Sequence, residues 1–510
     1  MSARPEVERW PPAVPVECVF RQTEPRDGGE QLLQLTATGI ELGGDELIPW
    51  SAVLGAQVAT DALLRRHVPS FSLPPAEKLS SRSLVVFGCL PTADVAPSAS
   101  RLHRLAAYAG SWATYVLSGG KTPTGRGRSL VQWVFRYTGE DSLAVVDRLA
   151  TAIQREAAPQ STTHSRRRFL AIVNPAGGSG IAERIYEQVV APVLEQSSAD
   201  VELVVTQHGG HARELAASLK LHQYDAVAIV GGDGLISEVV QGLMSRVDWA
   251  DAIRQPLGII PGGTGNGLSA SLLSRVGESL NPLNAAFALV KGTPLALDLT
   301  VVANDRGDML YSFLSVEWAF IAAMDIESER YRALGDVRFP VTTAKLLLGR
   351  LPHWSGTLRY LSSEQDSEVP QYAKASAAAP RPDLDALPST AQQWREIKGN
   401  FTMFWAMNVT HASTDAFIAP PACLDDGYMH IVVAAGPNAS RWQLLQLMLG
   451  IDSGSHLAVN HVQLLRTRGY SLRIDNPSDL VAVDGEVFGG QEFKAEILRG
   501  LARVVGLPNN

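Results

Sequence analysis

The chain has 510 residues, too many for one ordinary hydrophobic core, and its length predicts two or three domains. Hydrophobic residues make up 45% and charged residues 19%, a composition typical of globular proteins. The formal net charge of −8 argues against a nucleic-acid-binding surface, which would be broadly basic. The three cysteines are far apart, which excludes a disulfide framework or a zinc cluster and predicts a reducing compartment.

The N-terminal segment and the apolar stretches bear on localisation. Residues 1–17 contain no apolar core of signal-peptide length. The most apolar stretches, such as Leu444 to Ile451, are far shorter than the roughly 20 residues that span a bilayer. We therefore expect a cytoplasmic protein with peripheral membrane association.

Residues 15–158 are predicted to form a small sheet closed by a helix. Five segments carry β-branched and aromatic residues in rough alternation, divided by Gly, Pro and Asp. The segment after them has apolar residues at helical spacing, namely Leu143, Val146, Leu149 and Ile153. This order predicts a pleckstrin-homology-like module, whose ligand the sequence leaves open.

Residues 168–297 follow an alternating rhythm. Four short apolar runs without alternation predict strands buried on both faces: FLAIV (169–173), VELVV (201–205), AVAIV (226–230) and LGII (257–260). Helical patterns lie between them and begin at Ile181, His211 and Leu235. Alternating strands and helices predict an α/β domain with a mainly parallel sheet.

Residues 298–505 contain longer strand patterns and predict a β-rich, sandwich-like domain. The segment 362–397 interrupts them and is rich in Ala, Pro, Ser and acidic residues. Such a composition buries little apolar surface, so it predicts a disordered insertion.

Three of the α/β strands run into glycine turns, NPAGGSG, GGDG and PGGTGNG. In a parallel sheet these turns emerge at the carboxyl ends of the strands, where open α/β sheets bind ligands. Glycine turns expose backbone N–H groups, and the helices that follow aim their N-termini at the same place, which suits phosphate. One such turn could equally be a tight connection, but three at one edge favour a phosphate site.

Two familiar phosphate motifs do not apply. The chain has no G-x-x-x-x-G-K-[ST], which excludes a P-loop NTPase. Gly265 to Ala270 satisfies G-x-G-x-x-A, but it follows the fourth strand of the domain and no acidic residue stands about 20 positions on. We therefore discount dinucleotide binding.

Asp233 stands between the glycines of GGDG. Beside bound phosphates, a carboxylate would take a proton from an attacking hydroxyl or help to position a metal. The alternative is that it caps the helix beginning at Leu235, a common role for Asp.

Four motifs, VGGDGLISEVVQGL, IIPGGTGNGLSAS, SVEWAFIAAMDIESERYRALGDVRF and LVAVDGEVF, together resemble the sphingosine kinases, within the diacylglycerol-kinase catalytic superfamily. The likeness covers about 168–505 without the insertion. The first two motifs specify only the superfamily, and the third is more specific to sphingoid-base kinases. The resemblance implies phosphoryl transfer from ATP to the primary hydroxyl of a sphingoid base, in the cleft between the α/β and β-rich domains, with Mg²⁺ arriving with ATP.

The resemblance also implies roles for particular residues. Asp233 matches the family's general base. The positions that match the family's nucleotide contacts are Asn174, Pro175, Ala176, Thr206, Gln207, His208, Gly209, Gly210, Glu238, Gly263, Thr264, Gly265, Arg332, Arg338, Asp484, Gly485 and Glu486. The positions that match its substrate contacts are Gly231, Gly232, Asp233, Gly234, Ser315 and Asp325. The first glycine turn departs from animal members, because it has Ala176, Ser179 and Ile181 where they carry basic residues. No histidine or cysteine spacing predicts a structural metal site.

Asp325 lies at the edge of an apolar stretch, which favours a cationic amine with an apolar tail; the alternative is a surface Asp that begins a charged helix. Leu444, Leu447, Met448 and Ile451 share one helical face, as a lid over the tail or as plain core. The predicted partners are the sphingoid base and a membrane surface, not nucleic acid. The alternatives are a ceramide or diacylglycerol kinase of the same superfamily, or a catalytically inactive lipid-binding protein recruited to membranes.

Overall fold

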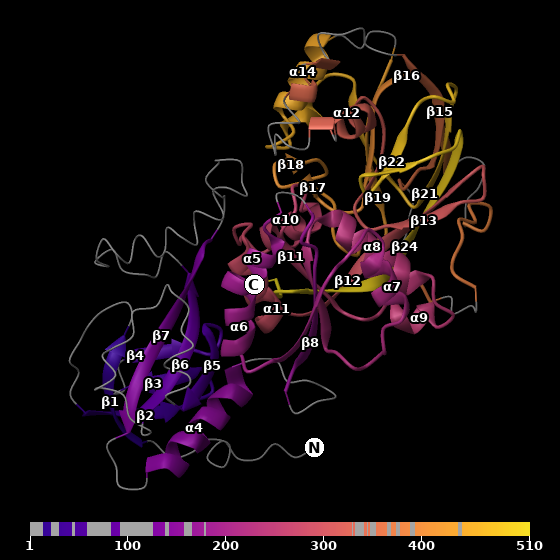
Figure 1. Ribbon diagram of the computed structural model, residues 1–510. Coiled ribbons are helices and arrows are strands. Elements are labelled where there is room, and N and C mark those ends of the chain that lie inside the picture. The colour runs from indigo at the N-terminus through magenta and orange to yellow at the C-terminus, as the bar shows by residue number, and fades with distance from the viewer. Residues whose placement is uncertain are drawn as a thin grey trace.

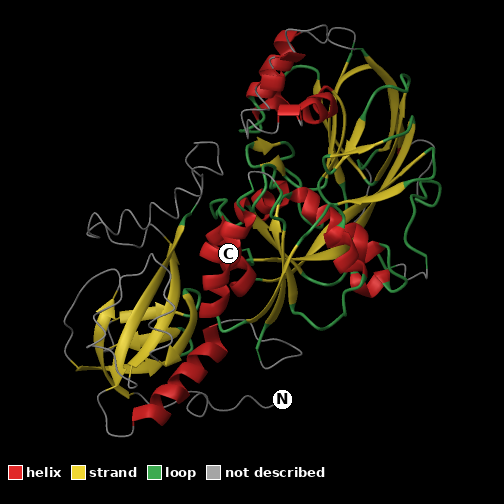
Figure 2. Ribbon diagram, in the orientation of Figure 1, coloured by secondary structure: helices red, strands yellow, loops and turns green. Residues whose placement is uncertain are grey.

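The computed structural model describes residues 14–21, 30–42, 46–58, 83–91, 126–137, 142–157, 166–177, 180–328, 330–331, 341–343, 345–346, 353–364, 369–373, 378–387, 393–436 and 441–509. An antiparallel N-terminal unit, an α/β unit and a β-rich unit follow one another along the chain (Figure 1). Helices lie beside the N-terminal sheet, in the α/β unit and at the far end of the β-rich unit, as Figure 2 shows.

The N-terminal unit is a seven-stranded antiparallel sheet with the order β4-β3-β2-β1-β7-β6-β5. Its strands are β1 (Val14–Arg21), β2 (Glu30–Leu35), β3 (Gly39–Leu42), β4 (Glu46–Pro49), β5 (Val53–Val58), β6 (Ser83–Pro91) and β7 (Arg128–Tyr137). Helix α4 (Ser142–Ala157) follows β7 and buries Val146, Leu149 and Ile153 in the same apolar cluster as Phe135 of the sheet. The sequence therefore predicted the sheet and its closing helix correctly.

Buried polar contacts fasten the N-terminal unit to the α/β unit. Arg128 donates to Glu278 through Nε (2.9 Å) and Nη2 (2.6 Å), and the two side chains are only 9% and 3% exposed. Lys291 donates to three backbone carbonyls of the N-terminal unit, those of Trp50 (2.7 Å), Val53 (3.0 Å) and Ala157. Burial lowers the pKa of Lys291 to about 8. The two units therefore share a specific, desolvated interface.

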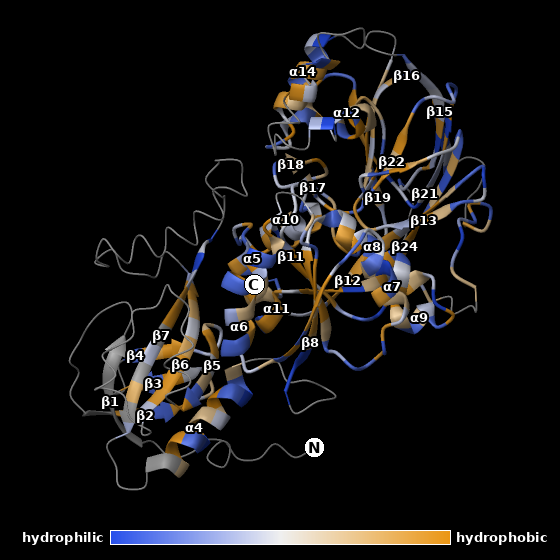
Figure 3. Ribbon diagram, viewed as in Figure 1, coloured by the Kyte–Doolittle hydropathy of each residue, from blue (hydrophilic) through white to orange (hydrophobic). Residues whose placement is uncertain are grey.

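The α/β unit confirms the predicted parallel sheet. Its strands are β8 (Arg168–Val173), β9 (Asp200–Val205), β10 (Ala226–Gly231) and β11 (Leu257–Pro261), in the parallel order β9-β8-β10-β11. Side chains alternate between two apolar clusters, with Ile172 and Ile229 on one face and Val173 and Val230 on the other. The two central strands, β10 and β11, are accordingly apolar (Figure 3) and buried along their whole length.

Helices cover both faces of this sheet. They are α5 (Ala182–Ile185), the π-helical turn η2 (Tyr186–Val190), α6 (Ala191–Gln196), α7 (His211–Ala217), α8 (Asp233–Met244), α9 (Trp249–Ala252), α10 (Gly267–Ser274) and α11 (Pro282–Lys291). The three helical patterns expected from Ile181, His211 and Leu235 thus form helices at those places.

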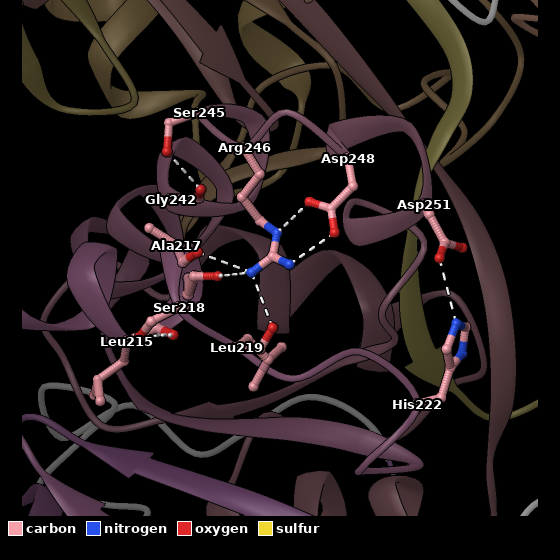
Figure 4. Close-up of polar contacts among 11 residues, drawn as sticks. Leu215, Ala217, Ser218, Leu219, His222, Gly242, Ser245, Arg246, Asp248 and Asp251 are labelled. Carbon is pink, nitrogen blue, oxygen red and sulfur yellow. Dashed lines mark hydrogen bonds and ion pairs between the residues drawn. The ribbon is translucent and has the colours of Figure 1, made fainter. Parts of the chain in front are cut away.

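Arg246, just after α8, satisfies carbonyls that the end of α7 leaves unpaired (Figure 4). Its Nη1 donates to the carbonyls of Ala217 and Leu219 at 2.8 and 2.9 Å. Its other nitrogens form a bidentate pair with Asp248, at 2.7 and 2.8 Å. This contact fixes α7 against α8, and the loops before both helices border the glycine turns.

The β-rich unit continues the same sheet. It comprises β12 (Thr293–Asn304), β13 (Met309–Ser312), β14 (Ser315–Ala319), α12 (Phe320–Ser328), β15 (Trp354–Leu361), β16 (Trp394–Met407), β17 (His411–Ser413), β18 (Ala416–Phe417), β19 (Met429–Ala435), α14 (Arg441–Leu449), the 3₁₀ turn η5 (Ser455–Ala458), β20 (Val462–Thr467), β21 (Gly469–Ile474), β22 (Val481–Val483), β23 (Glu486–Phe488) and β24 (Glu492–Gly506). Strand β24 pairs with β11 of the α/β unit and with β12 and β21. The domain boundary predicted between 297 and 298 falls inside β12, because this strand extends along both units.

The expectation of disorder across 362–397 is wrong for the parts of this segment that the structure describes. Val369 and Leu384 are buried, and the Tyr372 backbone N–H donates to Arg499 O at 2.9 Å. The Tyr311 hydroxyl donates to Pro380 O at 2.9 Å. The few apolar residues of the described parts are thus buried, and their backbone is hydrogen-bonded to distant parts of the chain. The composition of the segment alone does not reveal these contacts. Among the described helices, none is long and apolar enough to cross a membrane.

Candidate active site

Three glycine turns meet at the carboxyl edge of the parallel sheet, as the sequence predicted. The strands that lead into them, β8, β10 and β11, are neighbours. The Asn174 backbone N–H donates to Val230 O at 3.2 Å, and that of Gly262 donates to Gly231 O at 2.9 Å. Each turn is therefore hydrogen-bonded to the next.

The second and third turns approach so closely that side chains are excluded. A Cβ on Gly263 would lie 2.4 Å from Gly232 Cα, a distance that real Cβ atoms do not adopt. A Cβ on Gly265 would lie 2.9 Å from Asp233 Oδ2. Glycine is required here for close backbone approach rather than for an unusual φ.

Asp233 lies at the junction of these two turns. It is the first residue of α8, whose N-cap is Gly232 and which has no side-chain cap hydrogen bond. Its carboxylate instead accepts backbone N–H groups at the start of α10, from Gly267 at 2.8 Å (Oδ2) and from Leu268 at 3.3 Å (Oδ1). The alternative that Asp233 caps its own helix is therefore wrong, because the helix that it caps is α10.

Two opposing effects set the charge of Asp233. Asp233 is only 8% exposed, and this burial raises the pKa of its carboxyl to about 6. The backbone N–H groups at the start of α10 act in the opposite direction, because they stabilise the charged form. The group is thus ionised at neutral pH yet more basic than an exposed Asp.

The β-rich unit touches the third turn directly. Thr414 donates to Gly265 O through its backbone N–H (2.8 Å) and its hydroxyl (3.0 Å). The His411 backbone N–H donates to Ser271 Oγ of α10 at 3.0 Å. In Figure 1, β17 and β18 lie beside α10. The third turn is therefore held from both units.

The turn between β22 and β23 connects the glycine turns to α12. Glu486 Oε1 lies 3.9 Å from the position that a Cβ on Gly234 would take. Gly485 has φ +84°, and a Cβ there would lie 3.8 Å from Asp325 Oδ2. Asp325 is half-buried on α12. Gly485 and Glu486 thus lie between Asp325 and Gly234, the residue after Asp233.

Strand β14 presents two polar side chains beside Asp325. Ser315 and Glu317 are 1% and 6% exposed, and Ser315 Oγ donates to Glu317 Oε1 at 2.9 Å. Burial, with a further contribution from the Asp325 charge, raises the pKa of Glu317 to about 8 against the opposing effect of Ser315 and Trp405. Glu317 is therefore mostly uncharged at neutral pH.

Both carboxylate oxygens of Asp484 accept hydrogen bonds from the turn just before β14. It accepts hydrogen bonds from the Ser312 hydroxyl (2.6 Å) and from the backbone N–H groups of Phe313, Leu314 and Ser315 (3.2, 3.0 and 3.0 Å). Its backbone has φ +50°. In this structure Asp484 fixes the turn that leads into β14, so its contact with a nucleotide remains a prediction.

Other expected nucleotide contacts lie in the first turn, after β9 and in the third turn. The Ala176 N–H donates to Asn174 Oδ1 at 3.0 Å, and Pro175 follows Asn174 in that turn. Thr206 is buried, and its backbone N–H donates to Val173 O at 2.8 Å. Thr264 is half-buried in the third turn.

The loop before α7 presents a more open surface. Gln207, His208 and Gly209 are exposed, and a Cβ on Gly209 or Gly210 would meet nothing within 4 Å. Glu238 of α8 accepts the Ala212 N–H at 3.2 Å and so caps α7. Arg332 and Arg338 lie outside the described residues.

Glu317, Asn266 and Thr414 belong to this site but were not identified from the sequence. Asn266 has φ +58° and exchanges two hydrogen bonds with the backbone of Gly263, which shapes the third turn. An acid in the apolar run SVEWAF, two residues after Ser315, was the available signal for Glu317.

The apolar face of α14 packs into the β-rich core. Leu444, Leu447 and Ile451 are buried in one cluster with Met324 of α12, and Met448 packs against it. This placement agrees with the plain-core alternative.

The chain is similar in sequence to proteins of known families. Residues 168–302 match the diacylglycerol kinase catalytic domain family, and residues 390–506 match the family described as YegS C-terminal NAD kinase beta sandwich-like domain. "Sphingosine kinase 1" of Rattus norvegicus is 34% identical over 341 residues, covering 65% of this chain and 88% of its own length. "Sphingosine kinase 1" of Homo sapiens is 33% identical over 345 residues, with the same two coverages.

"Sphingoid long chain base kinase 4" of Schizosaccharomyces pombe is 30% identical over 341 residues, covering 65% of this chain and 73% of its own length. A solved structure described as a putative diacylglycerol kinase from Bacillus anthracis str. Sterne is 18% identical, with a TM-score of 0.47. It covers 69% of this chain and 99% of its own.

Proposed function

Because the chain belongs to the sphingosine kinase family, we propose that it transfers a phosphoryl group from ATP to the primary hydroxyl of a sphingoid base. The products are the base 1-phosphate and ADP. The observation that carries this proposal is the placement of Asp233 between two touching glycine turns, with Asp325 close by across Gly485 and Glu486.

Asp233 is the general base in this proposal. Burial makes its carboxylate more basic than an exposed one, and the N–H groups of Gly267 and Leu268 hold it in place. A pKa near the operating pH is the most effective for proton transfer. Asp233 would accept the proton of the primary hydroxyl as the oxygen attacks the transferred phosphorus.

The glycine turns fit the phosphates of ATP. The second and third turns are in backbone contact at Gly232 and Gly263, and glycine turns that lead into helix N-termini are suited to phosphates. Asn174, Thr206, Gly263 and Gly265 lie in these turns or beside them, and Arg332 and Arg338 match family residues that reach the phosphates. Mg²⁺ bound to the nucleotide would neutralise phosphate charge during transfer.

Asp325 is the proposed partner of the amine. A half-buried carboxylate beside the apolar cluster of the β-rich unit suits a cationic head with an apolar tail. A diacylglycerol has no amine, so it offers no cation to this carboxylate.

The N-terminal unit is proposed to be a pleckstrin-homology-like module. Its support is the antiparallel order of seven strands followed by α4, which packs over them. Peripheral membrane association is proposed because the substrate is a lipid.

A lipid-panel assay tests the function. The protein is incubated with Mg-ATP and sphingosine, ceramide or diacylglycerol in mixed micelles, and each phosphorylated lipid is quantified. We expect sphingosine to be phosphorylated fastest, and faster phosphorylation of diacylglycerol or ceramide would overturn the assignment. ATP consumption that does not depend on any lipid would favour an inactive lipid-binding protein.

A further inference from the structure

Ser315 and Glu317 lie on one face of β14. Residues two apart in a strand point to the same side, and their neighbours Val316 and Trp318 belong to the apolar core on the other side. The Ser315 backbone N–H donates to the Asp484 carboxylate at 3.0 Å. The backbone and the hydroxyl of Ser315 are thus both held.

The hydrogen bond from Ser315 to Glu317 determines what Ser315 can offer a ligand. A serine hydroxyl has one proton and two lone pairs. When Glu317 is ionised it can only accept, so the Ser315 proton is directed at Glu317 Oε1 at 2.9 Å and the lone pairs remain to accept a hydrogen bond. The complementary ligand group is a donor such as an ammonium or a hydroxyl.

The charged surroundings of Glu317 point to the same ligand. The acidic groups that face it are Asp325 of α12 and Asp484, while Ser315 and Trp405 of β16 are its polar neighbours. Two nearby buried carboxyl groups do not both ionise readily unless a cation joins them. A core needs no acid at this position, since an apolar side chain would avoid the cost of desolvation.

We propose that Glu317 is a positioning residue for the amine head of the sphingoid base: it orients the Ser315 hydroxyl as an acceptor and, with Asp325, supplies a second carboxyl that the bound ammonium neutralises. The inference rests on the proposed function. Glu317 is uncharged in the free protein at neutral pH and ionises when the ammonium arrives. Binding of the base therefore releases a proton below about pH 8.

The test compares wild type with Glu317→Gln, which keeps the size and one acceptor oxygen but cannot ionise. KM and kcat for sphingosine are measured from pH 6.5 to 8.5. The titration of the substrate amine is common to both proteins, so it cancels in the ratio of their KM values. We expect the KM of Glu317→Gln divided by the KM of wild type to rise about fivefold or more from pH 6.5 to pH 8.5. The reason is that the ionised fraction of a carboxyl increases about tenfold per pH unit below its pKa. The kcat and the KM for ATP should stay within about twofold.

Ser315→Ala provides a second test and should raise the KM for sphingosine with little change in kcat. Asp298→Asn is a matched control, because Asp298 is also buried with a pKa raised by burial to about 7, but its carboxylate binds the backbone N–H groups of Gly427 and Gly500. Its KM ratio to wild type should not change with pH. A Glu317→Gln ratio that is constant with pH, or a loss confined to kcat, would overturn the inference.

Direct binding separates this inference from the proposed function. The Kd of a fluorescent sphingoid base is compared with that of its uncharged N-acylated analogue, by anisotropy and without ATP. If the wild type binds the amine without phosphorylating it, the proposed function fails, yet a pH-dependent effect of Glu317→Gln on the Kd would still support the role of Glu317. Equal affinity for both probes would overturn it.

Discussion

The carboxylate of Asp233, the first residue of α8, accepts the backbone N–H of Gly267, the first residue of α10, at 2.8 Å. The N-termini of α8 and α10 thus meet at Asp233, which caps α10. Asp233 also directly follows Gly232, where the second and third glycine turns are in contact. The hydrogen bonds hold the carboxylate and favour its charged form, while burial raises its pKa to about 6.

Asp233→Asn should reduce kcat by about 10²–10⁴-fold, the usual contribution of a general base. The amide oxygen can still accept from Gly267, so the turn should keep its shape. The Kd for Mg-ATP, measured by calorimetry, should therefore change little. A variant that keeps more than a tenth of the wild-type kcat would contradict the role of Asp233.

The pH profile of kcat, measured at saturating sphingosine, should show a loss of activity as the pH falls through about 6. Burial raises the pKa of Asp233 to about 6, and only the ionised form can accept a proton. The acidic limb is measured with saturating Mg-ATP, and thermal unfolding at each pH serves as the control for stability. An acidic limb near pH 4, the range of an exposed Asp, would show that another group controls the rate.

Gly263→Ala should reduce activity by more than about tenfold. The new Cβ would lie 2.4 Å from Gly232 Cα, so the second and third turns must separate and Asp233 must shift. Misplacement of a catalytic group by about 1 Å can cost about 10²-fold in rate. The measurements are kcat, the Kd for Mg-ATP and the melting temperature; wild-type values for all three would show that the two turns do not meet as described.

Arg128→Met should destabilise the protein by about 3 kcal/mol, because it leaves Glu278 buried without its charge partner. The double variant Arg128→Met/Glu278→Met should recover much of this loss, since no uncompensated charge then remains. Denaturant unfolding of the full chain measures both. A single variant as stable as wild type would indicate that the N-terminal unit is not held by this pair.

The sequence predicted the parallel sheet and the three turns because buried strands and glycine turns are local patterns. The contacts of Asp233 were not predictable in the same way, since the helix that it caps begins 34 positions away. Asp484 likewise matched a family motif, while its hydrogen bonds are made with a turn more than 160 residues earlier in the chain.

The composition of the segment 362–397 gave a wrong prediction for those of its residues that the structure describes. Its few apolar residues predict disorder when the segment is considered alone, but Val369 and Leu384 are buried against strands distant in the sequence. Glu317 was missed for a related reason. An acid in an apolar run has a meaning only when its strand neighbours and the Asp325 carboxylate are placed around it.

Strand β24 has a mechanical consequence for substrate choice. One end of this strand pairs with β21, the other end pairs with β11 at Leu257, and β12 runs along nearly its full length. Bending the α/β and β-rich units apart would break that ladder. In the proposed reaction, this continuous strand pairing would hold the separation of Asp233 and Asp325 constant, and with it the spacing between the amine and the reactive hydroxyl of the lipid that can bind.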